Sequence, residues 1–213
     1  MASRIVHIAI ANEIMKLRPI KDRERFLLGS VLPDACSGRE PHFSLYVDGG
    51  TKKTFDLTGF RAFSGGRLPH DELYAGYYLH LLTDILHRHL MYDVIGYKPV
   101  PKRNVEQLHL DYALTNRYII LEYGLELDFS IPPDIENEPL LRAFDFDLSG
   151  FFNDMKKDFA ARPVGKPVFF TEKSARDLIA FSVPKCVAEL DALNNGGVHF
   201  DEKEYAWKRF VKG

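Results

Sequence analysis

The sequence predicts an all-α fold, with several helices in a single domain and a metal site between them. Segments with apolar residues at helical spacing recur along the chain. No segment shows the apolar–polar alternation of a β-strand, and no internal repeat is visible. Seven of the eight histidines lie before Tyr112. Because 213 residues suit one hydrophobic core, we treat residues 1–213 as one domain.

Composition and charge narrow the class of protein. The formal net charge is −2, whereas nucleic-acid-binding domains are typically strongly basic, so we expect no nucleic-acid partner. No stretch approaches the ~20 apolar residues of a membrane span, and no targeting segment is visible. We therefore expect a cytoplasmic protein without stable membrane insertion. Cys36 and Cys186 lie far apart, which favours reduced thiols over a disulfide. The sequence carries no signature of an oligomeric state.

The first half of the chain predicts helices separated by short polar loops. Ser3 and Asp22 are suitable N-caps for the first two helices, and Gly29-Ser30 is expected to end the second. The longest helix of this half contains no proline, and acidic residues precede it, where the helix dipole favours negative charge. The predicted helices of this half cover residues 3–17, 22–28, 55–63 and 75–90.

The second half predicts three further helices. A proline-rich loop at residues 127–140 separates the first two. Thr171 is a suitable N-cap for the last helix, and an Asn-Asn-Gly-Gly sequence ends it. The tail is expected to pack through Trp207 and Phe210. The predicted helices of this half cover residues 104–126, 147–161 and 171–193.

The clearest chemical signal lies in the helix predicted at residues 75–90. His80 and Asp84 stand four residues apart, so they share one helix face, with Cβ atoms roughly 5–6 Å apart. Tyr77 and Leu81 continue the same side, where a helix usually buries apolar side chains. A buried carboxylate needs a partner or a metal ion. The pair therefore predicts either a metal site or a His–Asp contact that only joins two helices.

Other histidines and aspartates lie close by in the sequence. Asp34 follows an apolar Val-Leu-Pro segment, whose stiffness suits a metal ligand or a general base, although Asp34 could instead cap a helix. His7 and His42 precede the helix, and each alone is also compatible with a structural role. Imidazole and carboxylate ligands suit Zn²⁺ or a similar divalent ion, and mixed sites of this kind more often keep an open position for water. The candidate metal ligands are His7, Asp34, His42, His80 and Asp84.

Three further histidines are candidates for an additional metal site. His87 lies three residues beyond Asp84 and stays near its face, whereas His89 points elsewhere. The helix dipole alone also accounts for histidines in a last helical turn. His109 and Asp111 are two residues apart, so at most one of them joins the same site easily.

Four stretches carry a resemblance to a known family: SRIVHIAIANEI, FLLGSVLPDA, PHF and YYLHLLTDILHR. They resemble the zinc-dependent phospholipase C family, in its short bacterial branch, over about residues 3–88 and more faintly to the C-terminus. The resemblance implies an all-helical zinc hydrolase of phosphate esters. It implies one zinc ion bound by Asp34, His42, His80 and Asp84.

The same resemblance implies a second, neighbouring ion held by His7 and Asp84, with Asp84 as the bridge. It also implies a catalytic role for Asp34, which would activate or orient the attacking water.

The sequence departs from that family at two places. The secreted enzymes use a processed N-terminal tryptophan as a ligand, whereas this chain begins with Met-Ala. They complete a third metal site with a histidine and a His-x-x-x-Glu pair. Here His87 or His89 could serve as the first ligand and His109 as the second, but position 113 is Ala113. We therefore expect one or two ions, of zinc or another divalent metal.

These observations favour a metal-dependent phosphoesterase that hydrolyses a phosphodiester or phospholipid head group. Its partner would be a small-molecule or lipid phosphate ester. An HD-type phosphohydrolase is one alternative, for which only His70-Asp71 supplies the adjacent His-Asp pair. A non-catalytic, metal-stabilised helical binding module is the other, and the incomplete third site favours it.

Overall fold

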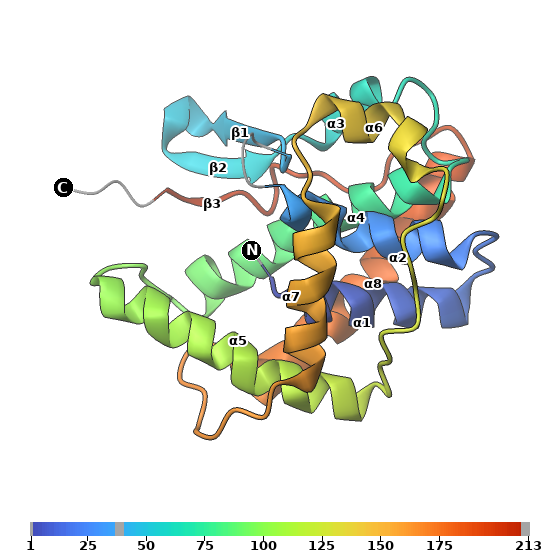
Figure 1. The fold of residues 1–213 in the computed structure, drawn as a ribbon. Coiled ribbons are helices and arrows are strands. Elements are labelled where there is room, and N and C mark those ends of the chain that lie inside the picture. The colour runs from blue at the N-terminus through green and yellow to red at the C-terminus, as the bar shows by residue number, and fades with distance from the viewer. Residues whose placement is uncertain (1, 37–40, 210–213) are drawn as a thin grey trace.

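The fold is mostly helical, as the sequence predicts (Figure 1). The computed structural model describes residues 2–36 and 41–209, and these residues form eight α-helices, short 3₁₀ and π turns and one small sheet. Ser3, Asp22 and Thr171 cap their helices as expected. The helices are α1 (Arg4–Leu17), α2 (Arg23–Val31), α3 (Leu57–Phe63), α4 (Glu72–His89), α5 (Lys102–Glu122), α6 (Pro139–Ala143), α7 (Leu148–Ala160) and α8 (Glu172–Asn194).

A three-stranded antiparallel sheet is an element that the sequence did not predict. Strands β1 (Ser44–Val47) and β2 (Lys52–Phe55) are joined by a 3₁₀ turn at Asp48–Gly50, and β3 (Trp207–Lys208) pairs with β2. These strands have two to four residues and mixed burial, so they are too short to display a period-two pattern.

The tail of the chain packs onto this sheet. Trp207 is buried, and its ring lies 5.2 Å from that of Phe55. The predicted contact of Phe210 lies outside the described residues. The sheet therefore ties the tail to the segment between α2 and α3.

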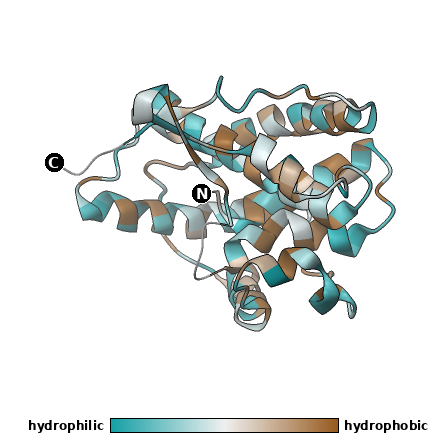
Figure 2. Cartoon of the chain, turned by 90° about the horizontal axis from the view of Figure 1, so that it is seen from above, coloured by the Kyte–Doolittle hydropathy of each residue, from teal (hydrophilic) through white to brown (hydrophobic). Residues whose placement is uncertain are grey.

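Helix α4 is the centre of the fold. Every residue from Leu73 to His87 is buried, because α4 is surrounded by α1, α2, α3 and α8. Most other helices carry both hydrophilic and hydrophobic segments, which is the pattern of helices with one exposed side (Figure 2). Any polar side chain in the middle of α4 must therefore find its partners inside the protein.

Helices α2 and α4 touch through their backbones. A Cβ atom added to Gly29 or Gly76 would lie 2.1 or 2.2 Å from a carbonyl oxygen of the facing helix. Only glycine permits this approach. The prediction that Gly29-Ser30 ends the second helix is therefore wrong, since α2 runs through both residues to Val31. The glycine serves helix packing there.

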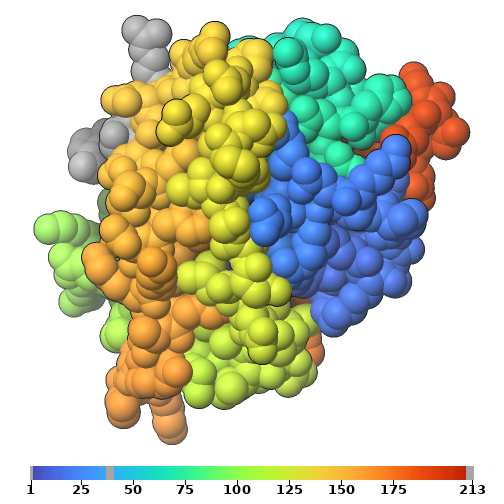
Figure 3. Space-filling model, turned by 45° about the vertical axis from the view of Figure 1, so that its right-hand side comes forward, coloured from blue at the N-terminus to red at the C-terminus, as the bar shows by residue number. Residues whose placement is uncertain are grey.

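The later part of the chain covers one face of this core. Figure 3 shows residues from about 125 to 165, coloured yellow to orange, lying against the blue N-terminal helices. Helix α7 packs against α5 and against the 3₁₀ turn that follows α2. The predicted loop at residues 127–140 is largely irregular, with a 3₁₀ turn at Ile135–Asn137, before α6 begins at Pro139.

A buried aspartate fixes the segment before α8. The carboxylate of Asp111 accepts hydrogen bonds from the backbone N–H groups of Val168, Phe169 and Phe170, with N···O distances of 2.9, 2.6 and 3.1 Å. Asp111 is fully buried, whereas His109 is exposed. The expectation that the two point to different places is confirmed.

Candidate metal centre

The structure brings five of the predicted ligands together from four separate elements. Helix α1 supplies His7, and the 3₁₀ turn at Leu32–Ala35 supplies Asp34. His42 comes from the segment before β1, and α4 supplies His80 and Asp84. Two groups of three residues have ligand atoms within 4.8 Å of one another: His42, His80 and Asp84, and His7, Asp34 and His80.

Asp34 and Asp84 each bring a carboxylate oxygen close to the facing nitrogens of His42 and His80. The Nε2 atoms of His42 and His80 lie 3.2 Å apart. Asp34 Oδ1 lies 3.4 and 3.9 Å from these two nitrogens, and Asp84 Oδ2 lies 3.8 and 3.7 Å from them. In a tetrahedral zinc site with bonds of ~2.0–2.2 Å, neighbouring ligand atoms are about 3.4 Å apart. The spacing therefore fits a zinc-sized ion with nitrogen and oxygen ligands.

Several of these polar atoms have no hydrogen-bond partner among the described residues. They are His7 Nε2, Asp34 Oδ1 and Asp84 Oδ2, and all three are buried. Buried polar atoms are normally hydrogen-bonded, and leaving one without a partner costs roughly 1–3 kcal/mol, or more for a charge. Three such atoms lie in one cluster of side chains that could hold a metal ion.

A hydrogen bond at the second ring nitrogen fixes the orientation of His80. Its Nδ1 donates to the backbone carbonyl of Ser30 at 2.9 Å, so the lone pair of Nε2 points into the centre. Burial lowers the pKa of His80 to about 3, and the nearby His7 imidazole acts in the same direction. His80 is therefore neutral at pH 7, which is the form that binds metal.

Aromatic contacts hold the segment that carries His42. The Tyr77 hydroxyl of α4 donates to the Pro41 carbonyl at 2.5 Å. Phe43, directly after His42, has a φ of 50°, in the left-handed region that non-glycine residues rarely adopt. Its ring lies 5.3 Å from that of Phe60 and 6.5 Å from that of Tyr77. Packing against the core therefore stabilises the backbone turn that aims His42 inward.

Asp84 joins the four-residue cluster to His7. Its Oδ1 accepts a hydrogen bond from the Ala2 backbone N–H at 2.7 Å and lies 3.4 Å from His7 Nε2. The His7 ring stacks on that of His80, with centroids 3.8 Å apart. Burial alone would raise the pKa of Asp84, but positive charge nearby and the His7 imidazole hold that pKa well below its ordinary value. Asp84 is therefore ionised, with its two oxygens facing opposite sides.

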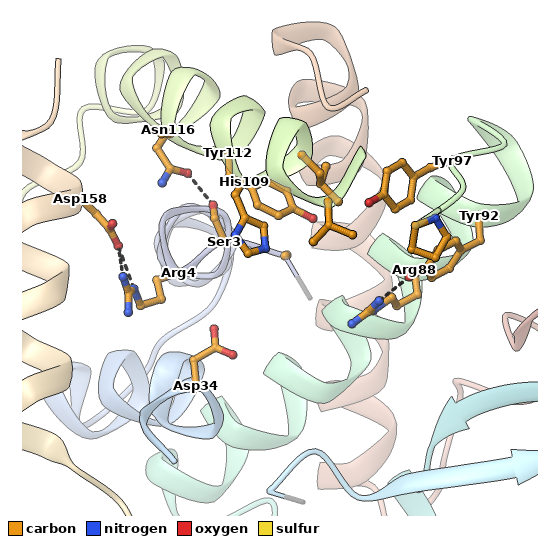
Figure 4. A pocket seen from close by; sticks show the side chains of 15 residues that line it. Ser3, Arg4, Asp34, Arg88, Tyr92, Tyr97, His109, Tyr112, Asn116 and Asp158 are labelled. Atoms are coloured by element: carbon orange, nitrogen blue, oxygen red, sulfur yellow. Dashed lines mark hydrogen bonds and ion pairs between the residues drawn. The ribbon is translucent and has the colours of Figure 1, made fainter. Parts of the chain in front are cut away.

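Asp34 is the member of the cluster that reaches a cavity. Its side chain is 11% exposed, whereas those of His80 and Asp84 are fully buried. It lines a cavity of about 620 Å³ (Figure 4). Burial raises the pKa of Asp34, but the electrostatic interaction with the neighbouring His80 imidazole and the contact with His42 outweigh burial and lower that pKa. An ionised carboxylate therefore lies between the buried ligands and a space large enough for a small molecule.

The cavity walls come from α1, α4, α5 and α7. Figure 4 shows Arg4 paired with Asp158 on one side and Arg88 on the other, with His109 of α5 between them. Ser3 donates to Asn116 Oδ1 at 2.5 Å and so holds the start of α1 against α5. The walls thus combine cationic groups with aromatic rings and apolar side chains.

The three additional histidines lie apart from one another. Within residues 2–36 and 41–209, none belongs to a group of three metal-ligating side chains. His87 is buried, and its Nε2 lies 3.0 Å from the Tyr112 hydroxyl. His89 Nδ1 lies 3.3 Å from Asp93, and exposed His109 faces the cavity. The structure therefore does not assemble a second centre from His87, His89 and His109.

The sequence reasoning missed the groups that surround the ligands. The carbonyl of Ser30 and the N–H of Ala2 are backbone atoms, for which sequence carries no signal. Arg4 and Asp158 are 154 residues apart, so their pairing is also unreadable from spacing. Arg88 did have a signal, since it lies four residues after Asp84 on the same helix.

Two other expectations concern residues outside the centre. His70 is exposed, and Asp71 caps α4 by accepting from the Leu73 N–H at 3.0 Å. This adjacent pair, on which the HD-type alternative depends, therefore lies outside the cluster. Across the described residues, α4 and the other helices include none that is both long and apolar enough to cross a membrane.

Comparisons with known proteins give no relative from which a role could be transferred. No family model matches the chain, and the searches of curated proteins and of solved structures returned no match. What this chain itself shows is a buried cluster of histidines and aspartates, between helices, that could hold a metal ion beside a cavity.

Proposed function

We propose that the protein is a metal-dependent phosphoesterase, as its resemblance to the zinc-dependent phospholipase C family implies. One observation carries the proposal: Asp34 belongs to the metal-ligating cluster and also lines the adjacent cavity. A purely structural metal site needs no such opening. Nitrogen and oxygen ligands without cysteine favour Zn²⁺ or another divalent ion of similar size.

Metal binding and activation of water would be the roles of different residues. His42, His80 and Asp84 would hold the ion, and His7 together with Asp84 would hold a second one. When bound, the metal supplies electrostatic stabilisation of the phosphoryl oxygens and a more acidic water. Asp34 would orient the attacking water and accept its proton.

The proposed reaction is a balanced substitution at phosphorus. The water oxygen bonds to phosphorus, the bond from phosphorus to the ester oxygen breaks, and that oxygen takes up a proton. The products are an alcohol and a phosphate with one ester bond fewer. The cavity of about 620 Å³ accommodates a small phosphate ester or the head group of a larger one.

The substitution Asp34→Asn tests this assignment. Asn keeps the volume and one acceptor oxygen but loses charge and basicity. Loss of a general base typically lowers the rate ~10²–10⁴-fold. Hydrolysis of bis(p-nitrophenyl) phosphate should be measured at saturating zinc, with metal content determined on the same sample. Asp154→Asn is the control, because Asp154 is an exposed aspartate of α7 that neither lines the cavity nor belongs to a ligand group.

Two outcomes decide the role of Asp34. A large loss of rate in Asp34→Asn at full metal content, with Asp154→Asn close to wild type, supports the proposal. Wild-type activity in Asp34→Asn at full metal content removes Asp34 from the mechanism. Asp34 lies within the 3₁₀ turn at Leu32–Ala35, and the next element among the described residues is strand β1, so a helix-capping role for Asp34 gains no support.

A non-catalytic metal-stabilised module is the second candidate. The observation that favours it is the four-residue cluster of Asp34, His42, His80 and Asp84, because four protein ligands are typical of closed structural zinc sites. It predicts that zinc raises the thermal midpoint while no phosphate ester is hydrolysed. Phosphoesterase activity in the zinc-loaded protein that is absent after chelation excludes this second candidate.

A further inference from the structure

Arg88 extends the line of metal-centre residues on α4 into the cavity. His80, Asp84 and Arg88 follow one another at intervals of four residues on one helix. At a rise of ~1.5 Å per residue, Arg88 lies about 6 Å further along the axis than Asp84 and on the same side. Asp84 belongs to the metal-ligating cluster, and Arg88 lines the cavity that Asp34 also lines (Figure 4).

The guanidinium of Arg88 is positioned without a carboxylate. Its Nη1 donates to the Tyr92 hydroxyl at 2.7 Å, and its carbon lies 5.6 and 5.8 Å from the ring centroids of Tyr92 and Trp207. Its Nε is buried and has no hydrogen-bond partner in the part of the chain that the structure describes. Two aromatic rings therefore hold the guanidinium beside the cavity that Arg88 lines, and no carboxylate among the described residues pairs with it.

Arg4, on the opposite wall of the cavity, differs in this respect. Its Nε donates to Asp158 at 2.8 Å, and its Nη2 lies 2.7 Å from the same carboxylate oxygen. Asp158 thus offsets the charge of Arg4. Between them, Asp34 and Asp84 would offset the charge of one divalent ion. Arg88, which forms no ion pair with any described residue, then contributes positive charge to the cavity.

We propose that Arg88 binds an oxygen of the substrate's phosphoryl group and makes the site prefer a dianionic phosphate, as in a phosphomonoester, over the monoanion of a phosphodiester. This inference rests on the proposed function and deepens it. A planar guanidinium suits two neighbouring phosphoryl oxygens, and its attraction rises with the charge on the phosphoryl group. A contact between Arg88 and the phosphoryl group would therefore favour phosphomonoesters as substrates.

The first test measures binding without catalysis. Inorganic phosphate is titrated into the zinc-loaded protein by calorimetry, for wild type and for Arg88→Met. Loss of a charge-assisted contact of this kind should raise the Kd for phosphate at least about tenfold. Arg61→Met is the matched control, because Arg61 also donates to a tyrosine hydroxyl at 2.7 Å, that of Tyr78, but does not line the cavity.

The second test measures preference between substrates. The ratio of kcat/KM for p-nitrophenyl phosphate to that for bis(p-nitrophenyl) phosphate should fall at least about tenfold in Arg88→Met and stay unchanged in Arg61→Met. Arg88→Lys keeps the charge but lacks the planar fork, so its phosphate Kd should lie between those of wild type and Arg88→Met. If Arg88→Met does not fold, as judged by circular dichroism, Arg88→Lys decides the matter through the same two measurements.

The outcomes separate this inference from the proposed function. Equal phosphate affinity in wild type and the Arg88 variants, or no phosphate binding by wild type, overturns the inference even if esters are hydrolysed. An equal loss of activity on both esters overturns the preference for a dianion. If wild type hydrolyses neither ester while its phosphate binding depends on Arg88, the proposed function fails and the anion-binding role of Arg88 stands.

Discussion

Replacing Gly76 by alanine should disturb both the fold and the metal centre. An added Cβ would lie 2.2 Å from the Phe26 carbonyl oxygen and 2.8 Å from the Ser30 nitrogen. Both are backbone atoms of α2, so no side chain can rotate away. Ordinary contact begins at 3.4 Å, which means that α2 and α4 must separate locally by about 1 Å.

The size of the effect follows from three contributions. Overpacking of this kind costs about 1–3 kcal/mol. The bond from His80 Nδ1 to the Ser30 carbonyl, now 2.9 Å, would lengthen beyond hydrogen-bonding distance and cost about 1 kcal/mol more. Alanine regains up to about 1 kcal/mol because it is the better helix former. The net loss is about 2 kcal/mol, which lowers the Tm by about 5 °C for a chain of this size.

The same substitution should weaken zinc binding, because His80 loses the group that orients it. Loss of such a contact typically costs ~10–100-fold in metal affinity. Scanning calorimetry of the metal-free protein and zinc competition against a chromogenic chelator measure the two effects. Gly197→Ala is the control, since a Cβ there meets only Ala192 O at 3.6 Å. If Gly76→Ala matches wild type in both Tm and zinc affinity, the account of the α2–α4 contact is wrong.

Three further outcomes are expected. Burial lowers the pKa of His80 to about 3, so between about pH 3 and 6.5 the unfolded state binds a proton that the folded state does not. The metal-free protein should therefore lose about 2 kcal/mol of stability between pH 7.5 and pH 5. Urea denaturation that gives the same stability at both pH values would contradict this. Asp111→Ala strands three backbone N–H groups and should cost about 3 kcal/mol, lowering the Tm by several degrees; an unchanged Tm would show that water replaces the carboxylate. Burial raises the pKa of Cys186 to about 12, so at pH 8 its thiol should react with a disulfide reagent only after unfolding, and rapid labelling of Cys186 in the native protein would refute its burial.

Helices were predictable where a local signal determined them. Ser3, Asp22 and Thr171 mark helix starts by capping, which depends only on neighbouring residues. Gly29 misled the prediction because a glycine looks the same in sequence whether it ends a helix or lets another backbone approach. The sheet was missed because Trp207 pairs with Lys53 across more than a hundred and fifty residues, and no local pattern encodes such a contact.

The ligand cluster was partly readable for a similar reason. His80 and Asp84 are related by helical periodicity, so one helix brings their side chains to the same face. His7, Asp34 and His42 reach the centre only through tertiary packing, and they were selected by residue type and by resemblance. Arg88 has the same four-residue spacing, yet an arginine on a helix is usually a solvated surface residue. Only the cavity beside it indicates a functional role.

Metal content after purification without chelator tests the central claim most directly. Elemental analysis should find at least one divalent transition metal ion per chain in the wild-type protein. The His80→Ala variant should lose it, because His80 belongs to both ligand groups, whereas His109→Ala should keep most of it. Equal metal content in wild type and His80→Ala would contradict the assignment. Loss of all metal in His109→Ala would instead place the centre partly on α5.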